Sequence, residues 1–157
     1  MGCGGRGTGA TENSLIATDT SMVVENNYGY TGPLATSNGG TTEPGITRVD
    51  LDPGGGCHTV WTNTQEHVPS TVSKLSLANG LVYTYAKDPE ANGVDAWYLT
   101  AVDFATGRTV FKRLAGTGLG YKDHYAPVSI GPDGAAYVGA LGGLIELRDR
   151  STGPSAG

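Results

Sequence analysis

The segment LSLANGLVY, residues 75–83, decides the fold because it recurs along the chain. Residues 128–137, VSIGPDGAAY, repeat it with a turn that is one residue longer, and residues 15–23, LIATDTSMV, form a weaker copy. In the two stronger copies, short runs rich in apolar residues flank a turn of the Asn-Gly or Pro-Asp-Gly type. This pattern predicts a β-hairpin at each place.

A second segment recurs along the chain, each time after a copy of the first. Residues 46–50, 99–103 and 144–148 read ITRVD, LTAVD and LIELR. No stretch of ten residues keeps the period of 3.6 that a helix needs, so the chain is expected to be all-β. The two recurring segments together predict about three four-stranded units. Four-stranded sheets that repeat every 40 to 50 residues or so are typical of β-propeller blades.

The recurrence also predicts how the chain is divided. We expect a flexible Gly-rich tether over residues 1–13, propeller repeats over approximately 14–70, 71–124 and 125–153, and a tail over 154–157. Because known propellers have about four or more blades, three units predict an incomplete ring. The chain is then a fragment of a longer protein, or two copies self-associate and supply about six blades.

Composition excludes several classes of function. The 157 residues contain 10 Lys and Arg against 15 Asp and Glu, a net charge of −5. A surplus of acidic residues argues against nucleic-acid binding and against attachment to anionic lipid. No apolar run reaches the 18 residues or so that a transmembrane helix needs, so we expect no transmembrane segment.

The third unit resembles a known family. Residues 134–153, GAAYVGALGGLIELRDRSTG, are similar to the PQQ-like repeat of quinoprotein β-propellers, and residues 99–111 are similar to the later half of that repeat. The repeat usually carries a tryptophan after its Thr-Gly pair; here Phe111 and Trp61 stand near that place. The resemblance extends over residues 14–153. It implies a bacterial propeller of a kind that serves dehydrogenases, assembly scaffolds and binding proteins alike.

The N-terminus suggests export. Met1-Gly2-Cys3-Gly4-Gly5 resembles the end of a bacterial lipoprotein signal, which predicts an extracellular or periplasmic protein with Cys3 as its lipid anchor. The chain has one other cysteine, Cys57. Two free thiols and a Cys3–Cys57 disulfide are both open alternatives.

Candidate chemistry lies in two loops that occupy corresponding positions in successive units. Glu66 and His67 lie in loop 63–73, and Asp123 and His124 lie in loop 115–127. Their nitrogen and oxygen atoms suit a divalent metal, with His67, Asp123 and His124 as ligands. They suit equally a general acid and base for hydrolysis of a lactone or ester, and the alternative to both is solvated loop residues.

Two aromatic residues near the second loop are candidate ligand-binding residues. Tyr121 and Tyr125 flank the second loop, and their rings can stack on a saccharide or another flat small molecule. The sequence thus predicts an exported binding or scaffold module of unknown ligand. The alternative is an enzyme, either a metal-dependent lactone or sugar hydrolase or a piece of a quinoprotein-like dehydrogenase.

Overall fold

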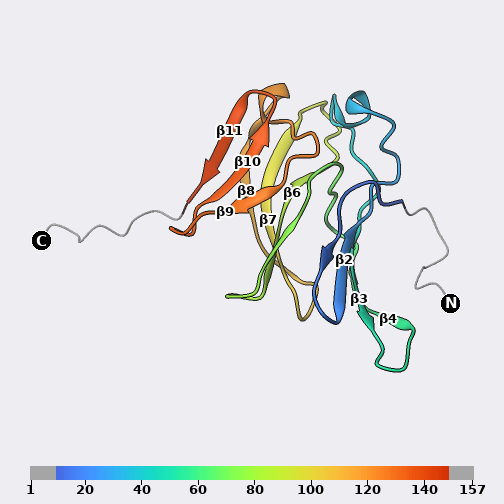
Figure 1. The fold of residues 1–157 in the computed structure, drawn as a ribbon. Helices are drawn as coiled ribbons and strands as arrows, with labels where there is room; N and C mark the ends of the chain where they lie inside the picture. Colours follow the sequence, from blue (N-terminus) through green and yellow to red (C-terminus); the bar gives the residue numbers. More distant parts are fainter. Residues whose placement is uncertain (1–9, 149–157) are drawn as a thin grey trace, which may run out of the picture.

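The computed structural model describes residues 10–148 and confirms an all-β chain. Within these residues, eleven strands form three antiparallel sheets of four, four and three strands, and none of the sheets is closed (Figure 1). Sheet 1 contains β1 (Ile16–Ala17), β2 (Ser21–Glu25), β3 (Ile46–Leu51) and β4 (Cys57–Asn63). Sheet 2 contains β5 (Lys74–Ser76), β6 (Leu81–Lys87), β7 (Ala96–Asp103) and β8 (Thr109–Thr117). Sheet 3 contains β9 (Val128–Ile130), β10 (Ala136–Ala140) and β11 (Gly143–Leu147).

Each recurring segment of the sequence becomes the same piece of structure. Residues 15–23, 75–83 and 128–137 form the first hairpin of sheets 1, 2 and 3. Every strand pairs with its neighbour in the chain, so each sheet is a simple meander. The described part of the chain also contains two short 3-10 helices, η1 (Pro33–Thr36) and η2 (Leu119–Tyr121). In the third unit, a fourth strand would fall on residues 149–157, which lie outside the described residues.

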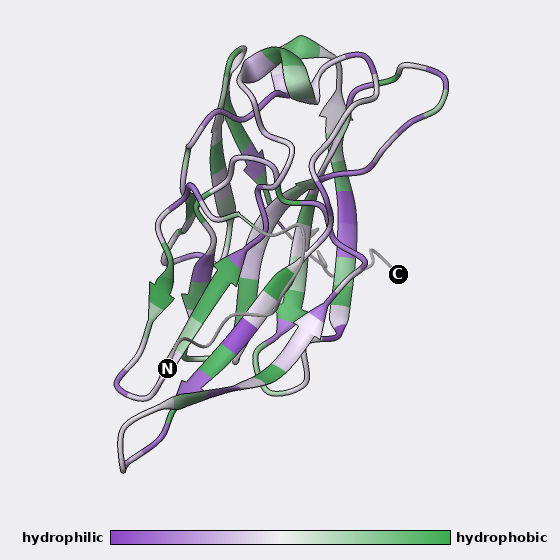
Figure 2. Ribbon diagram, turned by 90° about the vertical axis from the view of Figure 1, so that its right-hand side faces the viewer, coloured by the Kyte–Doolittle hydropathy of each residue, from purple (hydrophilic) through white to green (hydrophobic). Residues whose placement is uncertain are grey.

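The three sheets stand side by side in chain order, with sheet 2 in the middle (Figure 1). Hydrophobic and hydrophilic residues alternate along the strands (Figure 2), so each strand presents different residues to its two sides. Val82 and Val102 of sheet 2 pack against Val23 and Ile46 of sheet 1. This contact forms the first core.

The opposite side of sheet 2 forms a second core against sheet 3. Tyr85 and Trp97 stack with ring centroids 5.5 Å apart, and they pack with Val128 and Val138. Both rings are completely buried. Sheet 2 is therefore covered on both faces.

The segments that lead into the three sheets also lie together. Val72 pairs with Pro127 in a parallel bridge, and the N–H of Val128 donates to the Val72 carbonyl at 3.1 Å. The side-chain amide of Asn13 donates to the Thr71 carbonyl at 2.9 Å. The first strands of the sheets thus begin at a common edge, which we call the leading edge (residues 11–13, 70–73 and 123–128).

Part of the expected tether belongs to this edge. The Thr11 hydroxyl donates to the Glu25 carbonyl at 2.9 Å, and the N–H of Glu12 donates to Asn27 Oδ1, also at 2.9 Å. Thr11 and Glu12 are therefore bonded to the end of β2 and to the start of the β2–β3 connection. Residues 1–9, including Cys3, lie outside the described residues.

Candidate functional site

Four side chains from three separate segments meet beside the leading edge. We call this group, Glu12, Tyr30, His124 and Tyr125, the rim cluster. The hydroxyl of Tyr30 lies 3.0 Å from Nδ1 of His124, and the Tyr125 hydroxyl donates to Oε2 of Glu12 at 3.0 Å. The Tyr125 ring lies edge-on to Tyr30 at 5.7 Å and tilted against His124 at 4.8 Å.

The backbone at Tyr125 is strained. Its φ is 58°, in the left-handed region that residues with a side chain rarely adopt. The Asp123 carboxylate stabilises this turn by accepting the N–H of Ala126 at 2.9 Å. Even so, 39% of Tyr125 stays exposed. Strain of this kind is concentrated at binding and catalytic sites, because the surrounding structure must maintain it.

Both phenols of the rim cluster are neutral at neutral pH. Burial raises the pKa of Tyr30. Burial and the hydrogen bond to Glu12 raise the pKa of Tyr125 to about 12. Each tyrosine therefore offers an apolar ring face together with a hydroxyl, the combination that suits a ligand with both apolar and hydroxyl groups.

Tyr30 belongs to the long connection between β2 and β3, and buried lysines hold that connection in place. Lys87 Nζ donates to the Gly40 carbonyl at 2.5 Å and forms an ion pair with Asp95 at 3.0 Å. Lys122 Nζ donates to the carbonyl of Pro33 and to the hydroxyl of Ser37. The connection is thus anchored to sheet 2 and to η2, which keeps Tyr30 in position.

Asp123 and His124 are adjacent in sequence but lie in different surroundings. Asp123 is completely buried, and its carboxylate accepts hydrogen bonds from the hydroxyls of Thr71 and Ser70. Burial raises its pKa. Asp123 is therefore not a solvated loop residue, and His124 is exposed in the rim cluster.

Glu66 and His67 are likewise engaged within the protein. Glu66 is only 4% exposed; its carboxylate accepts the Thr109 hydroxyl at 2.7 Å and Lys112 Nζ at 2.9 Å. His67 Nδ1 donates to the Thr42 carbonyl at 2.6 Å. Because a carbonyl only accepts, His67 carries its proton on Nδ1.

Both predicted histidines contact the β2–β3 connection, but at different places: His67 at Thr42 and His124 at Tyr30. Within residues 10–148, no group of three or more His, Cys, Asp or Glu side chains is arranged to hold a metal ion. Tyr121 lies outside the rim cluster, and its ring covers Gly116 so closely that a Cβ there would lie 2.3 Å away. Of the sequence-predicted candidates, His124 and Tyr125 are the two that meet in the rim cluster.

Sequence reasoning missed Glu12 and Tyr30. Glu12 falls in the expected tether, and Tyr30 lies in a connection that has no copy in the other units. An aromatic pair, Tyr28 and Tyr30, in an otherwise polar insertion was the one local signal.

Comparison with known proteins adds no family: no family model matches the chain, and no curated protein matches it significantly. Within residues 10–148, none of the helices has the length and apolar character needed to cross a bilayer.

Proposed function

We propose that this protein is an exported binding module built from PQQ-like propeller repeats, and that its rim cluster binds a small saccharide or another flat, hydroxylated ligand. The observation that carries the proposal is the exposed Tyr125 ring, held at a positive φ beside Tyr30 and His124. The apolar face of a sugar ring stacks on aromatic side chains, and its hydroxyls bond to phenol, imidazole and carboxylate groups.

The contact between sheets 1 and 2 supports the propeller part of the proposal. Trp61 Nε1 donates to the Phe104 carbonyl at 2.9 Å, in the turn between β7 and β8. Trp61 lies opposite Arg48 in sheet 1, and Phe111 lies opposite Ala101 in sheet 2. These are matching positions of the repeat, and Phe111 packs into the next core, towards sheet 3. A contact repeated from one sheet to the next is what propeller blades require.

Self-association would cover the free side of sheet 1. Val23 packs into the first core, so its neighbours Met22 and Val24 point to the opposite side. Val49 lies opposite Met22 in the register, and Leu51 at the end of β3 is 43% exposed. A blade from a second copy, seated on this apolar side, would continue the stack.

The disulfide supports the exported part of the proposal. Cys57 is disulfide-bonded, so the alternative of a free thiol is wrong for this residue. Disulfides persist in oxidising compartments such as the periplasm and the extracellular space. Cys3 lies outside the described residues, and lipid anchoring there stays a prediction.

Saccharide binding can be tested directly. Cellohexaose, chitohexaose and maltohexaose would be titrated against the protein by calorimetry and by tyrosine fluorescence. We expect one of them to bind, and Tyr30→Ala and Tyr125→Asn each to weaken binding at least tenfold; Asn tolerates the positive φ. Tyr28→Ala is the control, since Tyr28 is 45% exposed but outside the cluster. Equal loss in all three variants, or no binding, would contradict the proposal.

The second candidate is a hydrolase, favoured by the 3.0 Å contact between the Tyr30 hydroxyl and His124 Nδ1. A paired imidazole and phenol can exchange a proton, as general acid–base catalysis requires. Turnover of γ-butyrolactone or an aryl ester that is lost in His124→Ala and kept in His67→Ala would favour this function. Turnover unchanged in both variants would eliminate it. The dehydrogenase alternative rests on the resemblance alone.

A further inference from the structure

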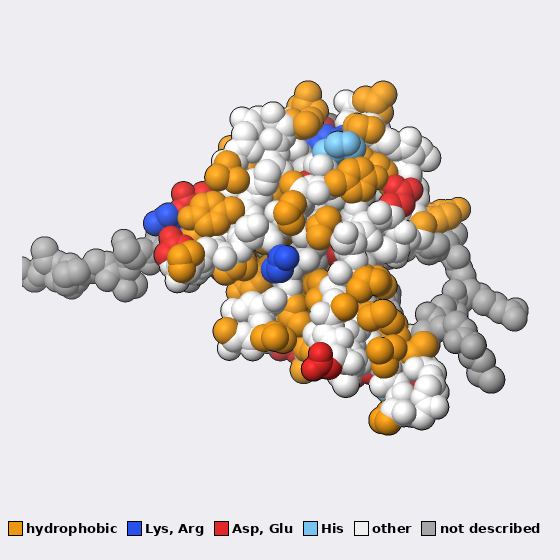
Figure 3. Space-filling model, in the orientation of Figure 1, with side chains coloured by type: hydrophobic (Ala, Val, Ile, Leu, Met, Phe, Trp, Pro, Cys, Tyr) orange, Lys and Arg blue, Asp and Glu red, His pale blue; other side chains and the backbone are white. Residues whose placement is uncertain are grey.

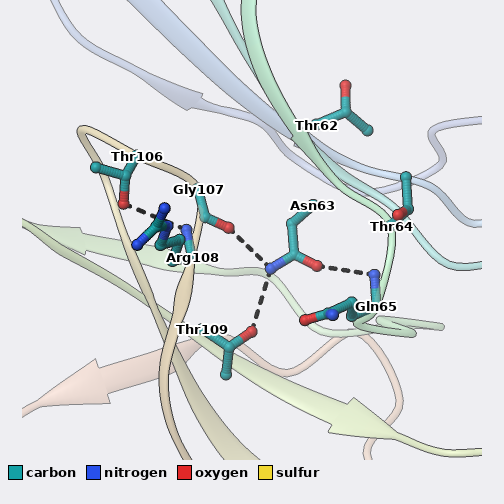
Figure 4. Close-up of a pocket in the computed structure, with 8 residues that line it drawn as sticks. All are labelled: Thr62, Asn63, Thr64, Gln65, Thr106, Gly107, Arg108 and Thr109. Carbon is teal, nitrogen blue, oxygen red and sulfur yellow. Dashed lines mark hydrogen bonds between the residues drawn. The ribbon is translucent and has the colours of Figure 1, made fainter.

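An open polar groove lies between sheets 1 and 2, at the end of β4 (Figure 4). Its volume is about 370 Å³. One wall is formed by residues 62–65 and the other by residues 106–109, in the turn before β8 and at its start. All of the lining residues except Gly107 are polar or charged. The groove belongs to the last strands of the two sheets, whereas the rim cluster lies by the leading edge.

Asn63 bridges the two walls of the groove (Figure 4). It is 6% exposed, and its side-chain amide donates to the Gly107 carbonyl at 2.9 Å and to the Thr109 hydroxyl at 3.1 Å. Its Oδ1 accepts the backbone N–H of Gln65 at 2.9 Å. All of these bonds are visible in Figure 4. Asn63 therefore fixes the two walls relative to each other, and the groove is preformed.

Three polar groups of the walls are left without a partner. The Thr64 hydroxyl, the Gln65 side-chain amide and the Arg108 guanidinium form no hydrogen bond or ion pair with any of residues 10–148. Thr64 and Gln65 lie on the wall opposite Arg108 (Figure 4). The groove thus offers one cation and two hydrogen-bonding side chains to a ligand.

Two carboxylates that lie close in sequence to the lining residues, Glu66 and Asp103, already have partners within the protein. Glu66 forms an ion pair with Lys112 at 2.9 Å. Asp103 accepts the N–H and the hydroxyl of Thr106, both at 2.7 Å. The chain has 15 acidic and 10 basic residues. Because Arg108 forms no ion pair with any carboxylate of residues 10–148, its guanidinium is available to the carboxylate of a ligand. Arg48, by comparison, is paired with Asp50 at 2.7 Å.

We propose that this groove binds a hydroxylated carboxylate of the uronic-acid type. The planar guanidinium of Arg108 matches a carboxylate with two parallel hydrogen bonds. Thr64 and Gln65 then bond to the ring hydroxyls from the opposite wall. The site is separate from the rim cluster, so the two binding activities are independent of each other.

The proposal is tested with trigalacturonate as the probe and maltotriose as its neutral counterpart, by calorimetry or chemical-shift titration. We expect trigalacturonate to bind saturably and at least tenfold more tightly than maltotriose, with an affinity that falls as salt is added. Arg108→Gln should weaken it at least tenfold, and Thr64→Ala should weaken it by a smaller factor. The rim variant Tyr125→Asn should leave it unchanged.

Arg113→Gln is the control. Arg113 is an exposed arginine, as Arg108 is, but it lies further along, within β8, and outside the groove. Equal loss in Arg108→Gln and Arg113→Gln would show general charge attraction and overturn the proposal. It would also be overturned by equal affinity for the two trisaccharides, by the lack of saturable binding, or by loss of binding in Tyr125→Asn. Unfolding curves of the variants separate a loss of binding from a loss of fold.

Discussion

The indole ring of Trp61 lies against Gly107, so closely that a Cβ added at position 107 would be 2.5 Å from the ring. Trp61 lies on β4 of sheet 1, whereas Gly107 lies in the β7–β8 turn of sheet 2, 46 positions further along the chain. Gly107 has a φ of 73°, so both its backbone conformation and its lack of a side chain are needed there.

Gly107→Ala is expected to lower the free energy of unfolding by about 2 kcal/mol or more, because the methyl group displaces Trp61 and the backbone is strained. Urea unfolding measures the loss. Gly134→Ala is the control: Gly134 has a similar φ of 79°, but nothing lies within 4 Å of a Cβ there. The control should lose only about 1 kcal/mol. Equal losses would contradict the role of the Trp61 contact.

Glu25 should make stability depend on pH. It is 2% exposed, and burial raises its pKa from 4.5 to about 6. The folded state therefore holds this proton more tightly than the unfolded state. The free energy of unfolding contributed by Glu25 is fully present below about pH 4.5 and falls as the pH rises towards 6, by about 2 kcal/mol. Unfolding curves between pH 4 and 7.5 measure this slope.

Glu25→Gln tests the assignment. It should raise stability at pH 7 and flatten the slope, although the raised pKa of Asp123 acts in the same direction and leaves a residual slope. Asp123→Asn, added to Glu25→Gln, should remove most of this remaining dependence of stability on pH. A wild-type protein whose stability rises between pH 4.5 and 6 would contradict the sign.

Cys57 should be unreactive towards a thiol reagent until the protein is reduced, because it is disulfide-bonded. Reduction, or Cys57→Ser, should lower the free energy of unfolding by about 2 to 4 kcal/mol. Thiol alkylation followed by mass spectrometry, with and without reductant, measures both states. A thiol that carries a lipid cannot also join a disulfide, so a lipid found on Cys3 would exclude a Cys3–Cys57 bond within one chain.

Self-association predicts a particle of twice the 16.1 kDa of one chain. Val24→Lys places a charge on the free side of sheet 1 and should yield a monomer that remains folded. Leu77→Lys is the control, because Leu77 is 80% exposed in the turn between β5 and β6 of sheet 2. Light scattering after gel filtration gives the masses. A wild-type monomer, or dissociation by both variants, would contradict closure through sheet 1.

Part of this molecule could be predicted from local pattern. Apolar and polar residues alternate in segments 75–83 and 128–137, and each segment has glycine in its turn. This pattern determines a hairpin, because each strand pairs with the strand directly beside it in the sequence. The all-β class and the recurring hairpins followed from this. Composition likewise argues against a basic binding surface, and the face drawn in Figure 3 carries few Lys or Arg side chains.

The candidate sites depended on contacts between distant segments. Tyr30 meets His124 across 94 positions, and Tyr125 meets Glu12 across 113. Neither pairing has a local signature, because the partners are so far apart in the chain. The β2–β3 connection, which carries Tyr30, also has no copy elsewhere in the sequence. Asp123 and Glu66 are a similar case: their loop positions left both a functional role and a solvated side chain open, and tertiary packing buries both. Sequence alone determined the hairpins, because their hydrogen bonds join residues that are close in the chain. Only the stacking of the sheets decided which polar side chains face solvent, because a side chain is buried by residues from distant parts of the chain.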